Sequence, residues 1–268
     1  MLSQADVEQI SVSSGRASGV VLADGRKFYA RKGVFCSVTP DALYNRMLPE
    51  DAVPASHRKK AQEFRFGRAD MQIHLALDRP APWPNEKLAR TAMVHVSNGI
   101  DEVARAVTLA NSGMLPDRPT IVVGQPAVND PSRMPDGKGL LWLQLQELPR
   151  HVKGDAAGVI DVPANGVWTR ELAEAYADRV IDRLDALAPG IKTAIVKRVV
   201  LSPLDIEAMN CNLVGGDPYA GDCALDQSFL WRPIKTSKTH RTPVKNLFHI
   251  GASTHPGPGL GGISGVIA

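Results

Sequence analysis

The chain has 268 residues, 44% of them hydrophobic, which is enough to bury the core of one large domain or of two smaller ones. Its 31 basic and 28 acidic side chains leave a net charge of only +3, and its longest basic cluster, HRKK at 57–60, is typical of a solvated helix start. This charge pattern argues against a nucleic-acid-binding protein.

No apolar run reaches the roughly 18 residues of a membrane span, and the first ten residues lack a signal-peptide pattern. The cysteines cannot all pair and match no zinc or CxxC spacing, so we expect reduced thiols, no metal site and a cytoplasmic protein. Peripheral membrane contact stays open. The three cysteines are Cys36, Cys211 and Cys223.

Residues 7–30 alternate in short apolar runs that are broken at Ser13–Gly15 and at Asp24-Gly25. Asp-Gly between such runs indicates a tight hairpin turn, because both of its central residues need a positive φ. We therefore expect a β-meander. The following run, KGVFCSVTP, predicts a strand that is buried on both faces and ends at Pro40.

The middle of the chain mixes strand and helix patterns. A helix is expected from a cap at Ser97 or Asn98 to Gly113, and a second one from Thr169 to Pro189. Strand patterns occupy residues 71–77, 90–97, 120–125, 139–148 and 195–202.

A last apolar strand, NLFHI, runs directly into GASTHPGPGLGGISGVIA. In this segment Gly257, Gly259 and Gly262 fit the spacing G-x-G-x-x-G, which in nucleotide-binding folds brings backbone N–H groups close to a phosphate. No βαβ unit follows, and no acidic residue lies about 20 positions further on. The loop is therefore not the first turn of a dinucleotide-binding fold.

The segment NLFHIGASTHPGPGLGGISGVIA resembles the C-terminal signature of the phytoene dehydrogenase-like FAD oxidoreductases, which include carotenoid desaturases and retinol saturases. Three upstream stretches extend the resemblance over nearly the whole chain. They are GRASGVVLADGRKFYARKGVFCSVTP, PAVNDPSRMPDGK and LDQSFLWRP.

The resemblance implies an α/β plus α+β architecture, namely the C-terminal part of a two-domain FAD/NAD(P)-binding Rossmann-type flavoprotein. Residues 1–48 and 226–268 would belong to the FAD domain, and residues 49–225 to a substrate domain. The family's N-terminal Rossmann turn is absent from this sequence, since the early glycines lack its spacing.

The resemblance also implies that the last strand ends near FAD and that the glycine loop lets the backbone approach the cofactor. Hydride chemistry would belong to the flavin, and no catalytic residue is assigned. The cofactor-binding residues expected on this basis are Gly251, Ala252, Ser253, Thr254, His255, Pro256, Gly257, Gly259, Gly261, Gly262 and Ile263.

Other polar side chains have structural interpretations beside functional ones. His255 either donates to a flavin oxygen or fixes the turn before Pro256. His249 is expected to pack in a buried strand, while His74 and His95 lie in separate strands. We expect the four tryptophans to pack in the core. We expect the polar residues of LDQSFLWRP to form a salt bridge or a turn. These polar residues are Asp226, Gln227 and Arg232.

Three hypotheses stay open at this point. The first is an FAD-dependent oxidoreductase, or a part of one, that transfers hydride on a small apolar substrate. The second is a truncated product or partner subunit that cannot bind FAD alone and that needs an N-terminal flavoprotein half or forms a homo-oligomer. The third is a fold that binds another phosphate ligand through its terminal loop. We expect the isolated chain to bind FAD poorly and to expose an apolar face.

Overall fold

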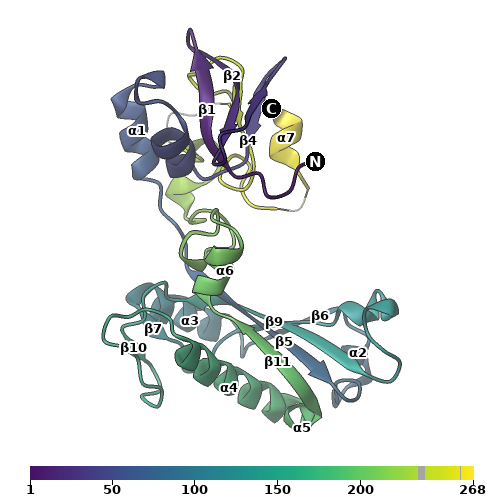
Figure 1. Cartoon of the computed structure of the whole chain (residues 1–268). Helices are drawn as coiled ribbons and strands as arrows, with labels where there is room; N and C mark the ends of the chain where they lie inside the picture. The colour runs from purple at the N-terminus through teal and green to yellow at the C-terminus, as the bar shows by residue number, and fades with distance from the viewer. Residues whose placement is uncertain (235–238, 260) are drawn as a thin grey trace. The chain divides into compact units, whose positions relative to one another are not determined.

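The computed structural model describes residues 1–234, 239–259 and 261–268 and divides the chain into two compact units (Figure 1). Unit 1 comprises Met1–Gly67 and Pro218–Ala268, and unit 2 comprises Arg68–Asp217. Unit 2 is thus an insertion within unit 1. Residues 49–67 and 218–225, which the sequence assigned to the inserted domain, pack with unit 1 because helix α1 (Ala55–Gln62) buries Ala61 in the unit-1 core.

Unit 1 begins with the predicted β-meander. Strands β1 (Val7–Ser13), β2 (Arg16–Leu22) and β3 (Lys27–Tyr29) pair antiparallel in the order β1-β2-β3. The first turn has positive φ angles at Ser14 (48°) and Gly15 (70°). In the second turn Gly25 has a positive φ (84°) but Asp24 does not, so the expectation of two positive φ angles there is wrong; Asp24 instead accepts a hydrogen bond of 3.0 Å from the backbone N–H of Arg26.

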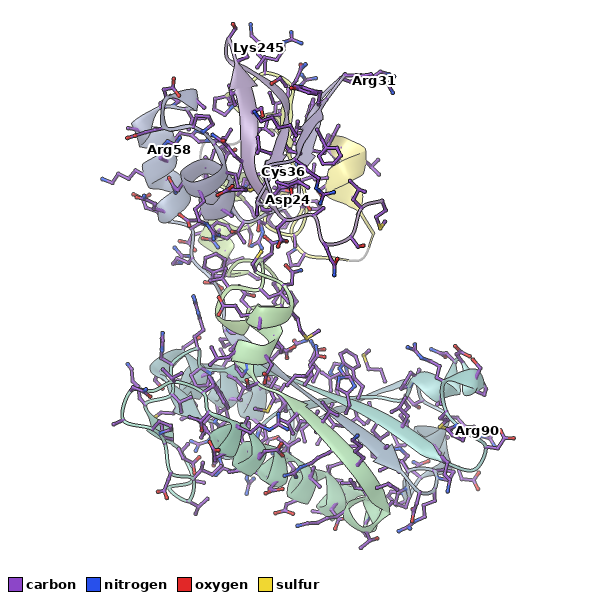
Figure 2. All side chains as sticks on the ribbon, in the orientation of Figure 1. Asp24, Arg31, Cys36, Arg58, Arg90 and Lys245 are labelled. Atoms are coloured by element: carbon purple, nitrogen blue, oxygen red, sulfur yellow. The ribbon has the colours of Figure 1, made fainter. Side chains whose placement is uncertain are left out.

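The first and last parts of unit 1 meet in a parallel strand pair. Strand β4 (Val34–Cys36) pairs with β12 (Leu247–His249) over their full lengths. The prediction that the β4 segment is buried on both faces is wrong, because the Phe35 side chain is 56% exposed and stacks on Phe248 at a centroid distance of 4.7 Å. Cys36, on the opposite side of β4, is buried (Figure 2), and burial raises the pKa of its thiol to about 11.

Unit 1 also contains short helical segments, of which η1 and α1 contribute to its core. Arg58 of α1 donates hydrogen bonds to the backbone carbonyl groups of Tyr44, Leu48, Pro49 and Glu50, which fixes the end of η1. The segments are η1 (Ala42–Met47), η2 (Glu50–Ala52), α1, η6 (Leu225–Gln227), η7 (Phe229–Trp231) and α7 (Ile263–Ile267).

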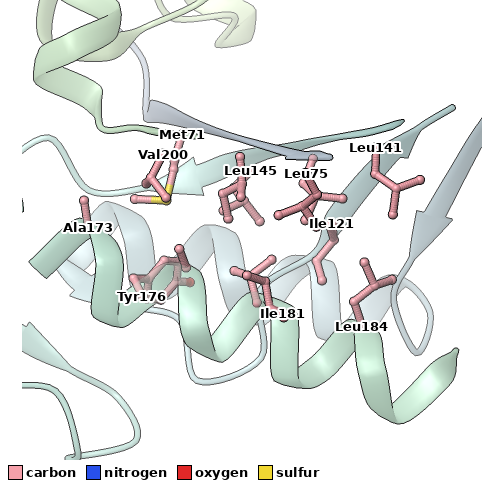
Figure 3. Close-up of a cluster of buried hydrophobic side chains, with 14 of the residues drawn as sticks. Met71, Leu75, Ile121, Leu141, Leu145, Ala173, Tyr176, Ile181, Leu184 and Val200 are labelled. Carbon is pink, nitrogen blue, oxygen red and sulfur yellow. The ribbon is translucent and has the colours of Figure 1, made fainter. Parts of the chain in front are cut away.

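Unit 2 is built on a five-stranded sheet in the order β11-β5-β9-β8-β6, whose paired neighbours are all antiparallel. Alternate residues of β5 and β9 are buried, and Leu75 and Leu145 pack toward Tyr176, Ile181 and Leu184 of helix α4 (Figure 3). The strands are β5 (Ala69–Leu77), β6 (Met93–Val96), β8 (Ile121–Gly124), β9 (Gly139–Leu148) and β11 (Ile195–Leu201).

The two predicted helices of unit 2 are present. Helix α4 (Arg170–Leu187) is capped by Thr169 as expected, since its side chain accepts a hydrogen bond of 3.2 Å from the N–H of Leu172. Helix α3 (Ile100–Ser112) starts after Gly99 rather than after Ser97 or Asn98, because the Glu102 carboxylate reaches back to the N–H of Asn98.

The remaining elements of unit 2 are short. Within the described residues, no helix combines the length and the apolar character needed to cross a bilayer. These elements are α2 (Glu86–Ala89), β7 (Met114–Leu115), η3 (Pro126–Val128), η4 (Pro131–Arg133), β10 (Gly154–Asp155), α5 (Ile191–Ala194), α6 (Pro203–Met209) and η5 (Val214–Gly216).

Candidate cofactor site

The glycine loop joins β12 to α7 and offers bare backbone on one side. Gly251, Gly257 and Gly262 have φ angles of 94°, 114° and 62°, a region that favours glycine. Among the described residues, a Cβ atom at Gly257, Gly259 or Gly262 would meet no atom within 4 Å, whereas one at Gly251 would lie 3.2 Å from the Cβ of Ser37. The start of the loop therefore packs against Ser37, whereas its later glycines have open space beside them among the described residues.

Two hydroxyl groups of the loop are turned inward. Ser253 donates to the carbonyl oxygen of Ala220 at 2.7 Å, and Thr254 donates to that of Gly251 at 2.8 Å. Both side chains are buried. The two hydroxyl protons thus stabilise the loop itself, and binding of the cofactor by Ser253 and Thr254 stays a prediction.

Ser264 of α7 closes the loop from its other end, because its Oγ accepts a hydrogen bond of 2.8 Å from the N–H of Gly251. This contact was not predicted from the sequence. Pro256, Gly261 and Ile263 are exposed, and Leu260 lies outside the described residues.

Arg232 is a buried residue that stabilises the loop through hydrogen bonds to backbone carbonyl groups. It is 2% exposed, and its guanidinium donates to the carbonyl oxygens of Ala252 (2.9 Å), Asp222 (2.9 Å), Tyr219 (2.9 Å) and Gly221 (3.2 Å). Such charge-assisted bonds to carbonyl groups compensate the burial of the cation. Two structural roles were considered for Arg232, a salt bridge and a turn. Its bonds to backbone carbonyl groups agree better with a residue that stabilises a turn.

The other polar residues of LDQSFLWRP also serve as scaffold. Gln227 is buried, accepts a hydrogen bond from the N–H of Arg65 and donates one to the carbonyl oxygen of Arg65, each at 2.8 Å. Asp226 forms an ion pair of 2.6 Å with the Arg65 guanidinium. These contacts fix the segment just before η7.

His255 is the loop residue with an unused polar atom. Its Nδ1 is buried and has no hydrogen-bond partner among the described residues, and its ring lies 6.5 Å from that of Phe229. Orphaned buried nitrogen atoms are costly, so such an atom beside bare glycine backbone favours a ligand with a polar edge. The residues present thus fit a planar polar cofactor such as the flavin of FAD.

The rings of His249, Tyr44 and His57 form a cluster that was only partly predicted. His249 packs in β12 as expected, and its Nε2 donates to the carbonyl oxygen of Val38 at 2.7 Å. Tyr44 makes edge contacts with the rings of His249 (5.8 Å) and His57 (4.6 Å). Burial lowers the pKa of His249 to about 4 and also lowers that of His57.

Unit 2 contains a buried carboxyl group that the sequence analysis missed. Asp70 is fully buried, accepts a hydrogen bond of 3.1 Å from Gln144, and has no partner for Oδ1 among the described residues. Burial raises its pKa to about 7, although hydrogen bonds from Gln144 and Gln72 oppose this effect. The available signal was a carboxyl group at the start of a strand whose later residues are mostly apolar.

The remaining candidates do not converge on a site. His74 and His95 lie on β5 and β6, which are separated by β9 and β8 in the sheet. Of the tryptophans, Trp168 is a core residue as expected and donates to the carbonyl oxygen of Pro149 at 3.0 Å, whereas Trp231 is half exposed.

No family profile matches the sequence, but similar proteins cover almost the whole chain. Pyridine nucleotide-disulfide oxidoreductase domain-containing protein 2 of Mus musculus is 28% identical over 97% of this chain and 44% of the mouse protein. A lycopene-forming phytoene desaturase of Paracoccus sp. is 26% identical over 99% of this chain and 48% of that enzyme. The chain therefore spans about half the length of these curated relatives.

Solved structures agree on the fold. An oxidoreductase from Methanosarcina mazei superimposes with a TM-score of 0.54 and 17% identity, covering 97% of this chain and 48% of that one. Cyclohexylamine oxidase from Brevibacterium oxydans gives a TM-score of 0.50 and 12% identity, covering 95% and 44%. The resemblance inferred from the sequence is confirmed.

Proposed function

We propose, from the similarity of this chain to the C-terminal portion of phytoene dehydrogenase-like FAD-dependent oxidoreductases, that it supplies the flavin-facing loop of such an enzyme. The observation that carries the proposal is the glycine loop after β12, where open positions at Gly257, Gly259 and Gly262 adjoin the unpartnered Nδ1 of His255. Bare backbone allows close approach of a cofactor, and the imidazole nitrogen can bind its polar edge.

Bound FAD would supply the hydride-accepting chemistry, and this chain would position it. The backbone of Gly257 and Gly259 would contact the cofactor, and His255 would hold a hydrogen bond at Nδ1. Arg232 and Ser253 keep the loop in shape through buried hydrogen bonds to carbonyl groups. These residues orient a ligand and do not themselves take part in bond making.

We further propose that the substrate is small or extended and apolar, and that unit 2 contributes to binding it. The similarity to phytoene desaturases supports this proposal. The sheet of unit 2 contains a row of paired residues that could contact such a substrate. The strand register aligns Met93, Gly124, Trp142, His74 and Val199 across the five strands. Met93 and Val199 are exposed, and burial lowers the pKa of His74, which favours its neutral form.

The alternative is a partner subunit that cannot bind FAD alone. It is supported by the β4–β12 pair, which forms a two-stranded parallel sheet in the described residues, with Phe35 exposed on it. Parallel sheets are normally larger and covered on both faces. We propose that further strands, from an N-terminal flavoprotein half or from a second copy, complete this sheet. A cytoplasmic location is proposed from the three free thiols.

The first test is an absorbance spectrum of the purified chain from about 300 to 550 nm, before and after addition of FAD and gel filtration. A retained band near about 450 nm would support flavin binding by this chain alone. A colourless chain that becomes yellow only when co-expressed with an N-terminal half would support the partner-subunit alternative. A chain that stays colourless in both cases would contradict the proposed function.

A further inference from the structure

Phe229 has a backbone conformation that its own side chain does not favour. Its φ is 51°, in the left-handed region that bulky residues rarely adopt. The ring is 63% exposed, so burial does not compensate for this conformation. A strained residue that gains little from packing points to a role in binding.

The segments on both sides of Phe229 hold it in place. Gln227, two residues before, is fixed by its hydrogen bonds to the backbone of Arg65. Arg232, three residues after, is fixed by its bonds to four carbonyl groups, one of which belongs to Ala252 in the glycine loop. Phe229 is therefore presented at a defined place relative to the loop.

The ring of Phe229 lies beside the open part of the loop. Its centroid is 6.5 Å from that of His255, and the planes are tilted by 46°, so the rings are neighbours without stacking. Within this small area the chain offers an exposed aromatic ring, an unpartnered imidazole nitrogen and bare backbone at Gly257. A planar heteroaromatic ligand with hydrogen-bonding atoms along one edge matches all three.

We propose that Phe229 holds the isoalloxazine ring of the flavin against the glycine loop, with His255 at the polar edge of that ring. The inference rests on the proposed function and adds a specificity-determining residue to it. The isoalloxazine ring carries both N–H and carbonyl groups, so it can bind Nδ1 of His255 in either tautomer. Adenine, the other ring of FAD, is the competing occupant.

The test uses the full chain with riboflavin and AMP as separate probes of the two rings, followed by saturation-transfer NMR, which detects weak binding. The variants are Phe229→Ala and Phe229→Gly. The matched control is Leu225→Ala, because Leu225 is 84% exposed in the same segment and has no ring contact with His255. Thermal unfolding of each variant reports on folding.

The inference predicts that both Phe229 variants bind riboflavin about tenfold more weakly, while the control is unchanged. Phe229→Gly should unfold at the same or a higher temperature, since glycine accepts the positive φ. Three results would each overturn the inference. All variants could bind riboflavin equally well, the Phe229 variants could lose affinity for AMP alone, or Phe229→Gly could unfold at a lower temperature than the wild type. A wild-type chain that binds neither riboflavin nor FAD, alone or co-expressed with an N-terminal half, would instead overturn the proposed function, and the assignment of Phe229 with it.

Discussion

The Nε of Arg232 donates a hydrogen bond of 2.9 Å to the carbonyl oxygen of Ala252, which ties the segment before the last strand to the glycine loop after it. Through its other bonds the same guanidinium also fixes residues 219–222. The integrity of the candidate site thus depends on a residue that does not face it.

Arg232→Met should destabilise unit 1 by about 3 kcal/mol or more, because it leaves buried carbonyl groups without donors. Urea unfolding, followed by hydrogen exchange of peptides that cover β4 and β12, measures the effect. The matched control is Arg65→Met, which removes a half-exposed ion pair with Asp226 and should cost less than about 1 kcal/mol. Equal losses for the two variants would contradict the prediction.

Gly259→Ala should leave the fold unchanged but weaken flavin binding. The φ of Gly259 is not in the left-handed region, and a Cβ there would touch no atom of the described residues within 4 Å. The added methyl group would occupy the surface where a ligand approaches the backbone. Gly265→Ala in α7 is the control, since its Cβ is equally free of contacts. Thermal unfolding and FAD titration separate folding from binding, and unchanged FAD binding by Gly259→Ala would argue against the loop as the site.

The stability of unit 1 should fall as the pH is lowered from about 6.5 to about 4. His249 has a folded pKa of about 4, below an unfolded value of about 6.5, so the unfolded state binds more protons in this window. The expected slope is about 1.4 kcal/mol per pH unit. His249→Gln should reduce the slope, whereas His95→Gln, at an exposed position of unit 2, should not change it. An unaltered slope in His249→Gln would contradict this assignment.

The stability of unit 2 should change in the opposite direction over a similar range. Asp70 has a folded pKa of about 7, above an unfolded value of about 3.9, so its stabilising contribution is present below about pH 4 and is lost as the pH rises to 7. Asp70→Asn, which cannot ionise, should be more stable than the wild type at pH 8. Hydrogen exchange of β5 peptides, corrected for intrinsic rates, measures this. A variant less stable at pH 8 than the wild type would show that the charged carboxylate supports the fold.

Much of the fold could be predicted because its signals are local. Thr169 caps α4, a turn forms at Asp24-Gly25, and a strand precedes the glycine loop, as the sequence indicated. Each of these depends on residue types within a few positions of one another. The start of α3 was missed because Gly99 and the carboxylate of Glu102 replaced the expected cap.

The supporting contacts of the candidate site could not be predicted. The partners of Arg232 are carbonyl oxygens, which every residue possesses, so no side-chain pattern marks them. The inward orientation of Ser253 likewise depends on the carbonyl group of Ala220, which only the folded chain brings near. The burial of Asp70 reflects the strands around it rather than its neighbours in sequence.

The interruption of unit 1 by unit 2 also bears on the order in which the protein folds during synthesis. Arg65 and Gln227, whose hydrogen bonds help to join the two parts of unit 1, are 162 positions apart. The whole of unit 2 is synthesised before Gln227 and emerges from the ribosome ahead of it, and domains generally fold as units as they emerge. The inserted sheet can therefore form while the first 67 residues are still waiting for the strand and the glycine loop that complete them, and this interval is when the nascent chain would need protection by chaperones.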